Sequence, residues 1–295
     1  MLYLFKYFTK NFLYFFELIK PRILFSNLFS SVSGYFFGIK NNSINYSIFF
    51  FMIFGLFFII SCGCVLNNIL DRKCDRQMKR TMNRVLAKKK ISIKESFIFS
   101  IILFILGTFF LCYFVSKIVF LISFFGLFVY VFLYTFLLKK KYPCSTIVGA
   151  FSGSCPILIG YLSVLNYDIY IGLLLFLIFF IWQIPHSYSV SLLNFKDYKN
   201  ANIKVFPIIY SFEFTLDNMY FFVNLLIFFN FIFSINSNLN KFHLIIFIIL
   251  GFFWLFYITK GYNIFLNYSK WLLKIFKFSI FYIFIFNISI CINYI

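Results

Sequence analysis

Long apolar stretches separated by short polar segments constrain this chain more than any other feature. A helix needs about 20 mostly apolar residues to cross the hydrocarbon core of a bilayer. Hydrophobic residues make up 63% of the chain and charged residues 12%, so a soluble domain is excluded. The sequence therefore predicts an all-α, polytopic membrane helix bundle, formed as one domain by residues 1–295. Nine transmembrane helices are expected, at residues 23–39, 46–68, 96–115, 118–138, 146–165, 169–190, 219–236, 242–259 and 272–291.

The basic residues predict the orientation of these helices. The chain carries 27 Lys and Arg against 8 Asp and Glu, a net charge of +19. With the N-terminus in the cytoplasm and the C-terminus outside, all of the basic residues lie inside except Lys40, Lys117 and Lys241. Cytoplasmic loops of membrane proteins collect Lys and Arg in this way. The charge thus indicates a multi-pass protein of the bacterial inner membrane, with the lipid bilayer and not a nucleic acid as its partner.

Two long polar segments, residues 69–95 and 191–218, fall on the predicted cytoplasmic side, where any chemistry is expected. Residues 1–22 carry charges and lack a small-residue cleavage site, which favours an interfacial amphipathic segment over a signal peptide. Small residues inside membrane helices allow close packing. The candidates for such contacts are Gly34, Gly38, Gly149, Gly153 and Gly160.

The more informative polar segment follows the second apolar stretch. If that stretch continues as a helix, Asn67, Asp71 and Asp75 lie one turn apart on one face. Two carboxylates at this spacing repel each other, so a divalent cation between them is expected, and carboxylate oxygens with water or phosphate ligands are typical of Mg²⁺. Cations follow directly, and a basic cluster beside a carboxylate–Mg²⁺ site is typical of a diphosphate site. These cations are Arg76, Lys79, Arg80 and Arg84.

A solvated basic loop is the alternative interpretation of this segment. In that case each Asp forms a local ion pair with a neighbouring cation. Lys139, at the end of the fourth apolar stretch, is similarly open to two interpretations. It either anchors the helix at the membrane surface or adds to the positive field around a diphosphate.

The second polar segment contains a further carboxylate and a histidine. Asp197 alone would be a surface ion pair with its neighbours Lys196 and Lys199, but opposite the first segment it can supply a third carboxylate to a metal. His186 follows Pro185, which is expected to kink or end its helix. Polar residues near an otherwise apolar helix end indicate side chains that face a cavity.

These motifs resemble a known family. The stretch from Asn67 to Arg84 resembles the first aspartate motif of the UbiA-type intramembrane prenyltransferases, with Asn68 where the motif usually begins with Asp. Residues 182–186 and 196–207 are similar to those of its haem-farnesylating branch, the haem O synthases. The likeness extends over nearly the whole chain. Asn194 and Lys204 depart from it, because the family commonly has a basic residue and Pro at these two positions.

The resemblance implies a Mg²⁺-dependent prenyltransferase. The implied reaction transfers the farnesyl group of farnesyl diphosphate to a vinyl group of haem B and adds water, giving haem O for a haem-copper terminal oxidase, a possible partner. The residues implied to hold Mg²⁺ are Asn67, Asn68, Asp71, Asp75 and Asp197, of which the three Asp are catalytic. The residues implied to bind diphosphate are Arg76, Lys79, Arg80, Arg84, Lys139 and Lys196, and those implied to contact haem are Trp182, Gln183 and His186.

Two alternatives remain open from the sequence. A prenyltransferase of the same fold can act on a quinone precursor of the 4-hydroxybenzoate type. A cation-coupled transporter can use Asp71, Asp75 and Asp197 as ion sites. Ion sites of transporters lie near the bilayer midplane in broken helices. The acidic residues here lie at predicted helix ends beside cations, which favours a diphosphate site.

Overall fold

The computed structural model describes residues 12–39, 43–164, 167–237, 239, 241–263 and 268–292. Over these residues the secondary structure is helical and includes no strand, which confirms the all-α class. A short helix covers residues 12–18. The elements that follow are α2 (Pro21–Ile39), α3 (Tyr46–Asp75), α4 (Ile93–Phe114), α5 (Lys117–Phe128), η1 (Val129–Leu138), α6 (Ser145–Leu162), α7 (Ile169–Leu193), α8 (Phe195–Asn200), α9 (Phe206–Ile209), α10 (Phe212–Asn236), α11 (Lys241–Thr259), η2 (Lys260–Asn263) and α12 (Tyr268–Ile292).

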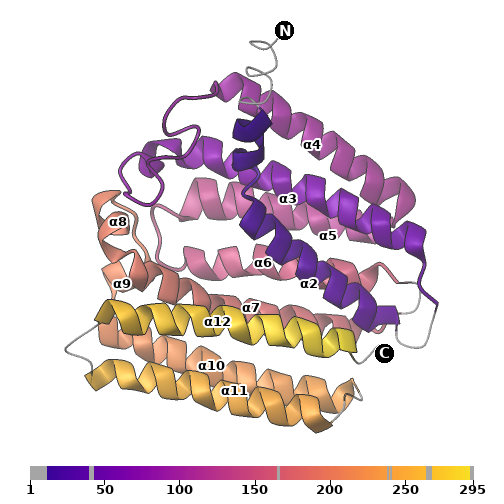
Figure 1. Ribbon diagram of the computed structural model, residues 1–295, viewed down its shortest axis with the longest axis vertical. Helices are drawn as coiled ribbons and strands as arrows, with labels where there is room; N and C mark the ends of the chain where they lie inside the picture. Colours follow the sequence, from indigo (N-terminus) through magenta and orange to yellow (C-terminus); the bar gives the residue numbers. More distant parts are fainter. Residues whose placement is uncertain are drawn as a thin grey trace.

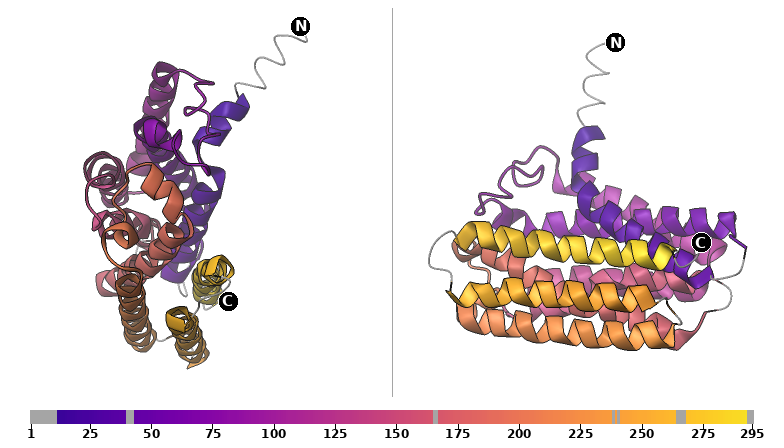
Figure 2. Two further views of the ribbon diagram at one scale, coloured as in Figure 1. Left: turned by 90° about the vertical axis from the view of Figure 1, so that its left-hand side faces the viewer. Right: turned by 60° about the horizontal axis from the view of Figure 1, so that its bottom comes forward.

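The long helices run side by side, so that their ends gather at two ends of the bundle (Figures 1 and 2). Helix α2 packs against α6, and α7 lies against α6, α10 and α12. The short helices α8 and α9 lie at one end of the bundle, together with the connection between α3 and α4 (Figure 1). Segments that are far apart in the sequence therefore meet at this end.

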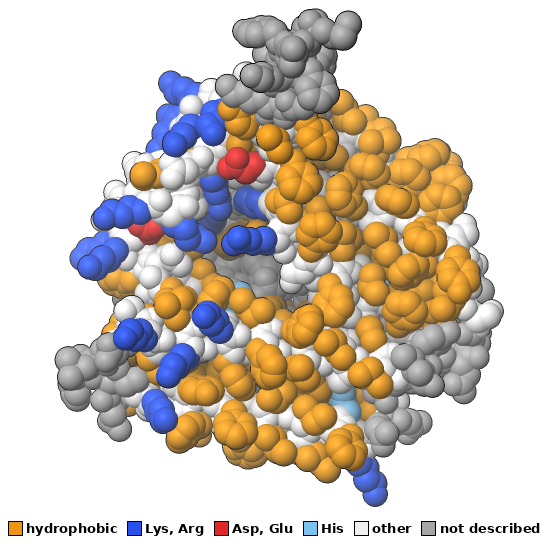
Figure 3. Space-filling view, in the orientation of Figure 1, with side chains coloured by type: hydrophobic (Ala, Val, Ile, Leu, Met, Phe, Trp, Pro, Cys, Tyr) orange, Lys and Arg blue, Asp and Glu red, His pale blue; other side chains and the backbone are white. Residues whose placement is uncertain are grey.

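Eight helices in the described part of the chain are long and apolar enough to cross a membrane. Helix α2 is not among them, since Arg22, Asn27 and four Ser residues reduce its mean hydropathy. Large hydrophobic side chains cover much of the surface (Figure 3), as expected of a surface that faces lipid. The chain is therefore a multi-pass membrane protein. The count of nine spans and the orientation of the termini stay predictions.

Three differences from the expected helix boundaries bear on the site. Helix α3 continues beyond residue 68 to Asp75, so residues 69–75 are helical. Helix α7 continues through Pro185 to Leu193, three residues beyond the expected span, so Pro185 does not end it, because packing against neighbouring helices compensates for the one hydrogen bond that Pro cannot donate. Helix α10 begins at Phe212, where the Ser211 side chain accepts a hydrogen bond from the Phe214 amide, and the segment 191–218 is largely helical.

Helices α2 and α6 approach each other through glycines, as the sequence predicts. A Cβ on Gly160 would overlap the carbonyl oxygen of Ser31, and a Cβ on Gly34 would overlap the carbonyl oxygen of Ile157. These neighbours are backbone atoms of the facing helix, which a rotamer change cannot move. Glycine on both helices therefore sets the distance between α2 and α6.

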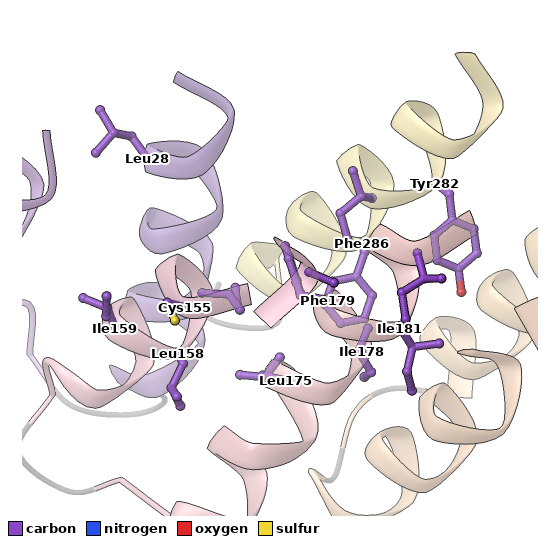
Figure 4. Close-up of a cluster of buried hydrophobic side chains, with 14 of the residues drawn as sticks. Leu28, Cys155, Leu158, Ile159, Leu175, Ile178, Phe179, Ile181, Tyr282 and Phe286 are labelled. Carbon is purple, nitrogen blue, oxygen red and sulfur yellow. The ribbon is translucent and has the colours of Figure 1, made fainter. Parts of the chain in front are cut away.

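A single buried cluster of hydrophobic side chains joins α2, α6, α7 and α12 (Figure 4). Leu28 comes from α2, Cys155 and Leu158 come from α6, Phe179 comes from α7 and Phe286 comes from α12. Dense packing of this kind leaves little room for the helices to shift relative to one another. The cluster fixes the scaffold on which the polar residues at the end of the bundle are placed.

Replacing Gly160 with Ala is expected to separate α2 from α6 and to destabilise the protein by about 1–3 kcal/mol, as overpacking of a core does. The midpoint of thermal unfolding in detergent micelles measures this effect. Gly149→Ala on the same helix is the matched control, since its nearest neighbour is a movable ring carbon of Tyr134 at 3.1 Å. Equal midpoints for the two variants would contradict the assigned role of Gly160.

Candidate active site

The polar face of α3 is buried, and its residues lie in the register that the sequence predicts. Asn67, Asp71 and Asp75 are each at most 3% exposed. The Asn67 amide Nδ2 donates to Asp71 Oδ2 at 3.0 Å and to Thr135 Oγ1 at 3.1 Å. Because α3 continues to Asp75, the three side chains lie one turn apart on a single helix face. The prediction of one polar face is thus confirmed.

Each of the two carboxylates on this face pairs with its own cation. Lys139 forms an ion pair with Asp71, and Arg84 Nη1 donates to both oxygens of Asp75 at 2.9 Å. A buried carboxylate without a partner is strongly destabilising. The local ion pairs of the alternative interpretation are present, although the carboxylates are buried and not solvated.

A π-helix places the cation that meets Asp71. The ten residues of η1 extend α5, and the backbone hydrogen bond from the Lys139 amide to the Tyr134 carbonyl, at 2.8 Å, has the five-residue spacing of a π-helix. The Thr135 hydroxyl donates to the Tyr130 carbonyl at 2.8 Å. Segments of π-helix occur frequently at functional sites. Here η1 brings Thr135 and Lys139 against α3.

Burial alone would lower the pKa of Lys139, but the attraction of the adjacent Asp71 carboxylate is stronger than this effect and raises the pKa above its ordinary value. The pKa of Lys20 shifts in the other direction. Burial, followed by repulsion from Arg84, lowers the pKa of Lys20 to about 8. The two lysines therefore differ in charge at mildly alkaline pH, although both lie beside α3.

Lys20 is a site residue that the sequence does not reveal, since it lies within the predicted interfacial segment. Its ammonium group donates to Asn67 Oδ1. Lys20 has a positive φ of 52°, and α2 begins at the next residue, Pro21. This tight turn between the helix at 12–18 and α2 directs Lys20 towards α3. A cation directly before a proline that begins a membrane helix was the available signal.

Asp197 connects the two polar segments through backbone hydrogen bonds. Its carboxylate accepts from the amide of Lys79 at 3.2 Å and from the amide of Arg80 at 3.0 Å. A small hydrophobic cluster beside it packs Cys74 and Met78 against Ile203. In the described part of the chain, no three His, Cys, Asp or Glu residues gather into a metal-binding group. The structure therefore does not bring Asp197 together with Asp71 and Asp75 as three ligands of one ion.

The remaining predicted cations lie around the rim of this cluster. Arg76 donates through Nε to the Ala87 carbonyl at 2.9 Å, which fixes its guanidinium group at the α3–α4 connection. Lys79, Arg80 and Lys196 are exposed. Lys and Arg side chains gather around a hollow on this face of the molecule (Figure 3). Such a basic rim attracts anions.

Two buried oxygens on α3 can accept a further partner. Asn68 Oδ1 and Asp71 Oδ1 are buried and have no hydrogen-bond partner among the described residues. The Asn68 amide, in contrast, donates to the Leu18 carbonyl at 2.9 Å, and this bond fixes the orientation of its side chain. Buried polar atoms are usually satisfied. Two buried oxygens without partners, three residues apart on α3, are of the type that Mg²⁺ prefers as ligands.

Trp182 and His186, two of the three residues predicted to contact haem, form an aromatic layer with Phe276 between α7 and α12. The rings of Trp182 and His186 stack with centroids 4.9 Å apart, and the ring of Phe276 covers the His186 ring at 5.4 Å. Gln183 lies against α6, where a Cβ on Gly153 would overlap its amide group. The three predicted residues are half-buried.

A separate apolar cavity of about 360 Å³ lies among α5, α6 and α7. It is lined by Leu121, Ile122, Phe125, Phe151, Cys155, Leu158, Leu173 and Phe176. None of the predicted site residues borders it. This cavity is thus distinct from the polar cluster on α3.

Comparisons with known proteins identify the family and the fold of the chain. The protoheme IX farnesyltransferase of Buchnera aphidicola subsp. Baizongia pistaciae is 36% identical over 292 residues, which cover 96% of this chain and 97% of the relative. A structure of digeranylgeranylglyceryl phosphate synthase matches with a TM-score of 0.80 at 20% identity, over 97% of this chain and 99% of that one. A UbiA homolog from Archaeoglobus fulgidus bound to GPP and Mg²⁺ matches with a TM-score of 0.68 at 15% identity, over 94% and 99%.

The two solved structures establish similarity of fold only, since their sequence identity to this chain is too low to show more. The match to the UbiA prenyltransferase family extends over residues 27–281 and includes every residue of the polar cluster except Lys20. With well over half of its length matched, the chain belongs to the UbiA prenyltransferase family.

Proposed function

We propose that this chain transfers a farnesyl group from farnesyl diphosphate to a vinyl group of haem B and adds water, giving haem O. The allylic C–O bond breaks and its electron pair leaves with the diphosphate. The vinyl group forms the new C–C bond, water adds to the resulting cation, and a proton is released. The observation that carries this proposal is the 36% identity, over 96% of the chain, to a protoheme IX farnesyltransferase.

Three cations on different segments support recognition of the diphosphate. Lys20, Arg84 and Lys139 already surround the carboxylates of α3. As the C–O bond breaks, charge accumulates on the leaving diphosphate, and donors that are already positioned stabilise it at this stage. The exposed Lys79, Arg80 and Lys196, together with Arg76, form the outer rim that attracts the anion.

The proposed Mg²⁺ ligands are Asn67, Asn68, Asp71, Asp75 and Asp197. The unpartnered Asn68 Oδ1 and Asp71 Oδ1 are the main support for this assignment. This set is not preassembled in the structure: Asp75 would release Arg84, and Asp197 would release the amides of Lys79 and Arg80, to bind the ion. When bound, Mg²⁺ neutralises the diphosphate and makes it a better leaving group.

The surroundings of the polar face suit a reaction that passes through an allylic cation. The rings of Tyr130 and Tyr134 stack with centroids 6.0 Å apart on η1, and Lys139 Nζ lies 5.7 Å from the centre of the Tyr134 ring. Aromatic faces stabilise a nearby cation. The apolar bundle limits the entry of water, which protects the cation from early hydrolysis. Trp182, Gln183 and His186 are the proposed contacts of the haem acceptor.

We place this enzyme in the bacterial inner membrane, with all of residues 1–295 acting as one domain. One continuous buried cluster, with members from Leu18 to Ile290, supports the assignment of a single domain. The product, a haem with a farnesyl tail, is the form that a haem-copper terminal oxidase or a haem-handling partner receives. Both substrates are apolar molecules with anionic groups, which suits a membrane bundle with a basic end.

Membranes that contain this chain, given haem B, farnesyl diphosphate and Mg²⁺, are expected to produce a haem heavier by one farnesyl group plus water. Chromatography and mass spectrometry of the haem pool measure this product. Asp71→Asn is expected to reduce the rate at least about 100-fold, since it removes charge from the polar face of α3. Asp168→Asn is the control, because Asp168 caps α7 at the opposite end of the bundle. Transfer to hydroxybenzoate-type acceptors instead of haem would overturn the proposed function.

The rate constant kcat/KM for farnesyl diphosphate is expected to fall about tenfold as the pH rises from 7 to 9. Lys20, whose pKa is about 8, is charged below this range and neutral above it, and a charged donor to an anion contributes about 1.5–3 kcal/mol. Lys20→Arg keeps the charge at every pH and should abolish the decline. Lys94→Arg, at an exposed position, should retain it. A decline that persists unchanged in Lys20→Arg would exclude Lys20 as its origin.

A further inference from the structure

Ser279 on α12 holds both polar side chains of the aromatic layer on α7. Its carbonyl oxygen accepts a hydrogen bond from Trp182 Nε1 at 2.8 Å, and its hydroxyl lies 2.7 Å from His186 Nδ1. Ser279 itself is completely buried. One residue of α12 thus fixes two residues that lie one turn apart on α7.

The hydrogen bonds of Ser279 determine which nitrogen of His186 carries the proton. The Ser279 hydroxyl donates its single proton to the Phe276 carbonyl at 2.7 Å. It can therefore only accept from His186, which places the imidazole proton on Nδ1. In the neutral ring the other nitrogen, Nε2, then has an available lone pair.

The Nε2 atom is the one polar atom of the His186 side chain that stays available for a further partner. Trp182 and Phe276 both stack on the imidazole ring, with centroids 4.9 Å and 5.4 Å from it and interplanar angles of 17° and 28°. Among the described residues, Nε2 has no hydrogen-bond partner, and the side chain is only half-buried. A neutral imidazole that donates through Nδ1 and presents Nε2 is the usual form of a histidine ligand to a metal.

We propose that Ser279 is a positioning residue that holds His186 in the Nδ1–H tautomer, so that Nε2 binds the iron of the haem acceptor. This inference rests on the proposed function, because the iron belongs to the substrate. The hydrogen bond from Nδ1 increases the basicity of Nε2 and fixes the ring. A single iron–nitrogen bond then anchors the porphyrin at its centre, while the vinyl groups at its edge stay available for prenylation.

Binding of haem B alone to the purified protein in detergent tests this inference without turnover. Resonance Raman spectra of the ferrous complex report the iron–histidine stretching mode. The wild-type protein is expected to show this mode, and His186→Ala is expected to lose it. Ser279→Ala should lower its frequency, because the hydrogen bond to Nδ1 is removed, and should weaken haem binding about tenfold. Ser279→Thr keeps the hydroxyl and should restore both properties.

Ser234→Ala is the matched control for Ser279→Ala. Ser234 is also buried in a membrane helix, and its hydroxyl donates to the carbonyl of Asn230 in its own helix. This control should leave the haem spectrum and affinity unchanged, and the thermal unfolding midpoint shows whether each variant is folded. A wild-type spectrum in His186→Ala, or an unchanged frequency in Ser279→Ala, would overturn the inference. Iron–histidine binding without farnesyl transfer would instead overturn the proposed function alone.

Discussion

Two buried carboxylates on one face of α3 impose the main electrostatic constraint on this structure. A buried charge without a partner costs several kcal/mol, so the fold has to bring cations to Asp71 and Asp75. Lys139, directly after η1, pairs with Asp71, and Arg84, in the connection between α3 and α4, pairs with Asp75. Lys20 adds a third cation from the turn before α2, through Asn67. The polar face of α3 thus interacts with three segments that are distant in the sequence, and all three lie at one end of the bundle.

The rest of the scaffold keeps these segments in place. The glycine contact between α2 and α6 sets the position of α2, whose first residue directly follows Lys20. Asp197 holds the backbone amides of Lys79 and Arg80, and the small cluster of Met78 and its neighbours joins the two polar segments. The carboxylate at 197 therefore organises the basic rim.

The sequence predicted the features that depend on helical periodicity and on scarce residue types. The register of Asn67, Asp71 and Asp75 follows from their spacing alone, and the close contact at Gly160 follows from residue size. The family and its two polar motifs were also recognisable. Each of these features depends on residues close together in the sequence, so a single sequence is enough to predict it.

The remaining features depend on tertiary contacts that no local pattern encodes. The position of Lys20 before Pro21 marks it only as a cation at a helix start, and nothing around Ser279 shows that it meets a residue on a distant helix. The partners of Asp197 are backbone amides, which are present at nearly every position and so leave no sequence signal. Pro185 was expected to kink or end its helix, but the helix does not end there, because the packing of α7 against three other helices outweighs the loss of one hydrogen bond.

Lys139 and Arg84 occupy the two carboxylates that would face Mg²⁺, so we expect both cations to be exchanged for the ion when the diphosphate binds. A structure with Mg²⁺ and an unreactive farnesyl diphosphate analogue decides whether this exchange occurs. We expect Lys139 and Arg84 to leave the two carboxylates and contact the diphosphate, while Asn68 Oδ1 and Asp71 Oδ1 face the metal ion. Intact Lys139–Asp71 and Arg84–Asp75 pairs, with the diphosphate bound elsewhere, would contradict it.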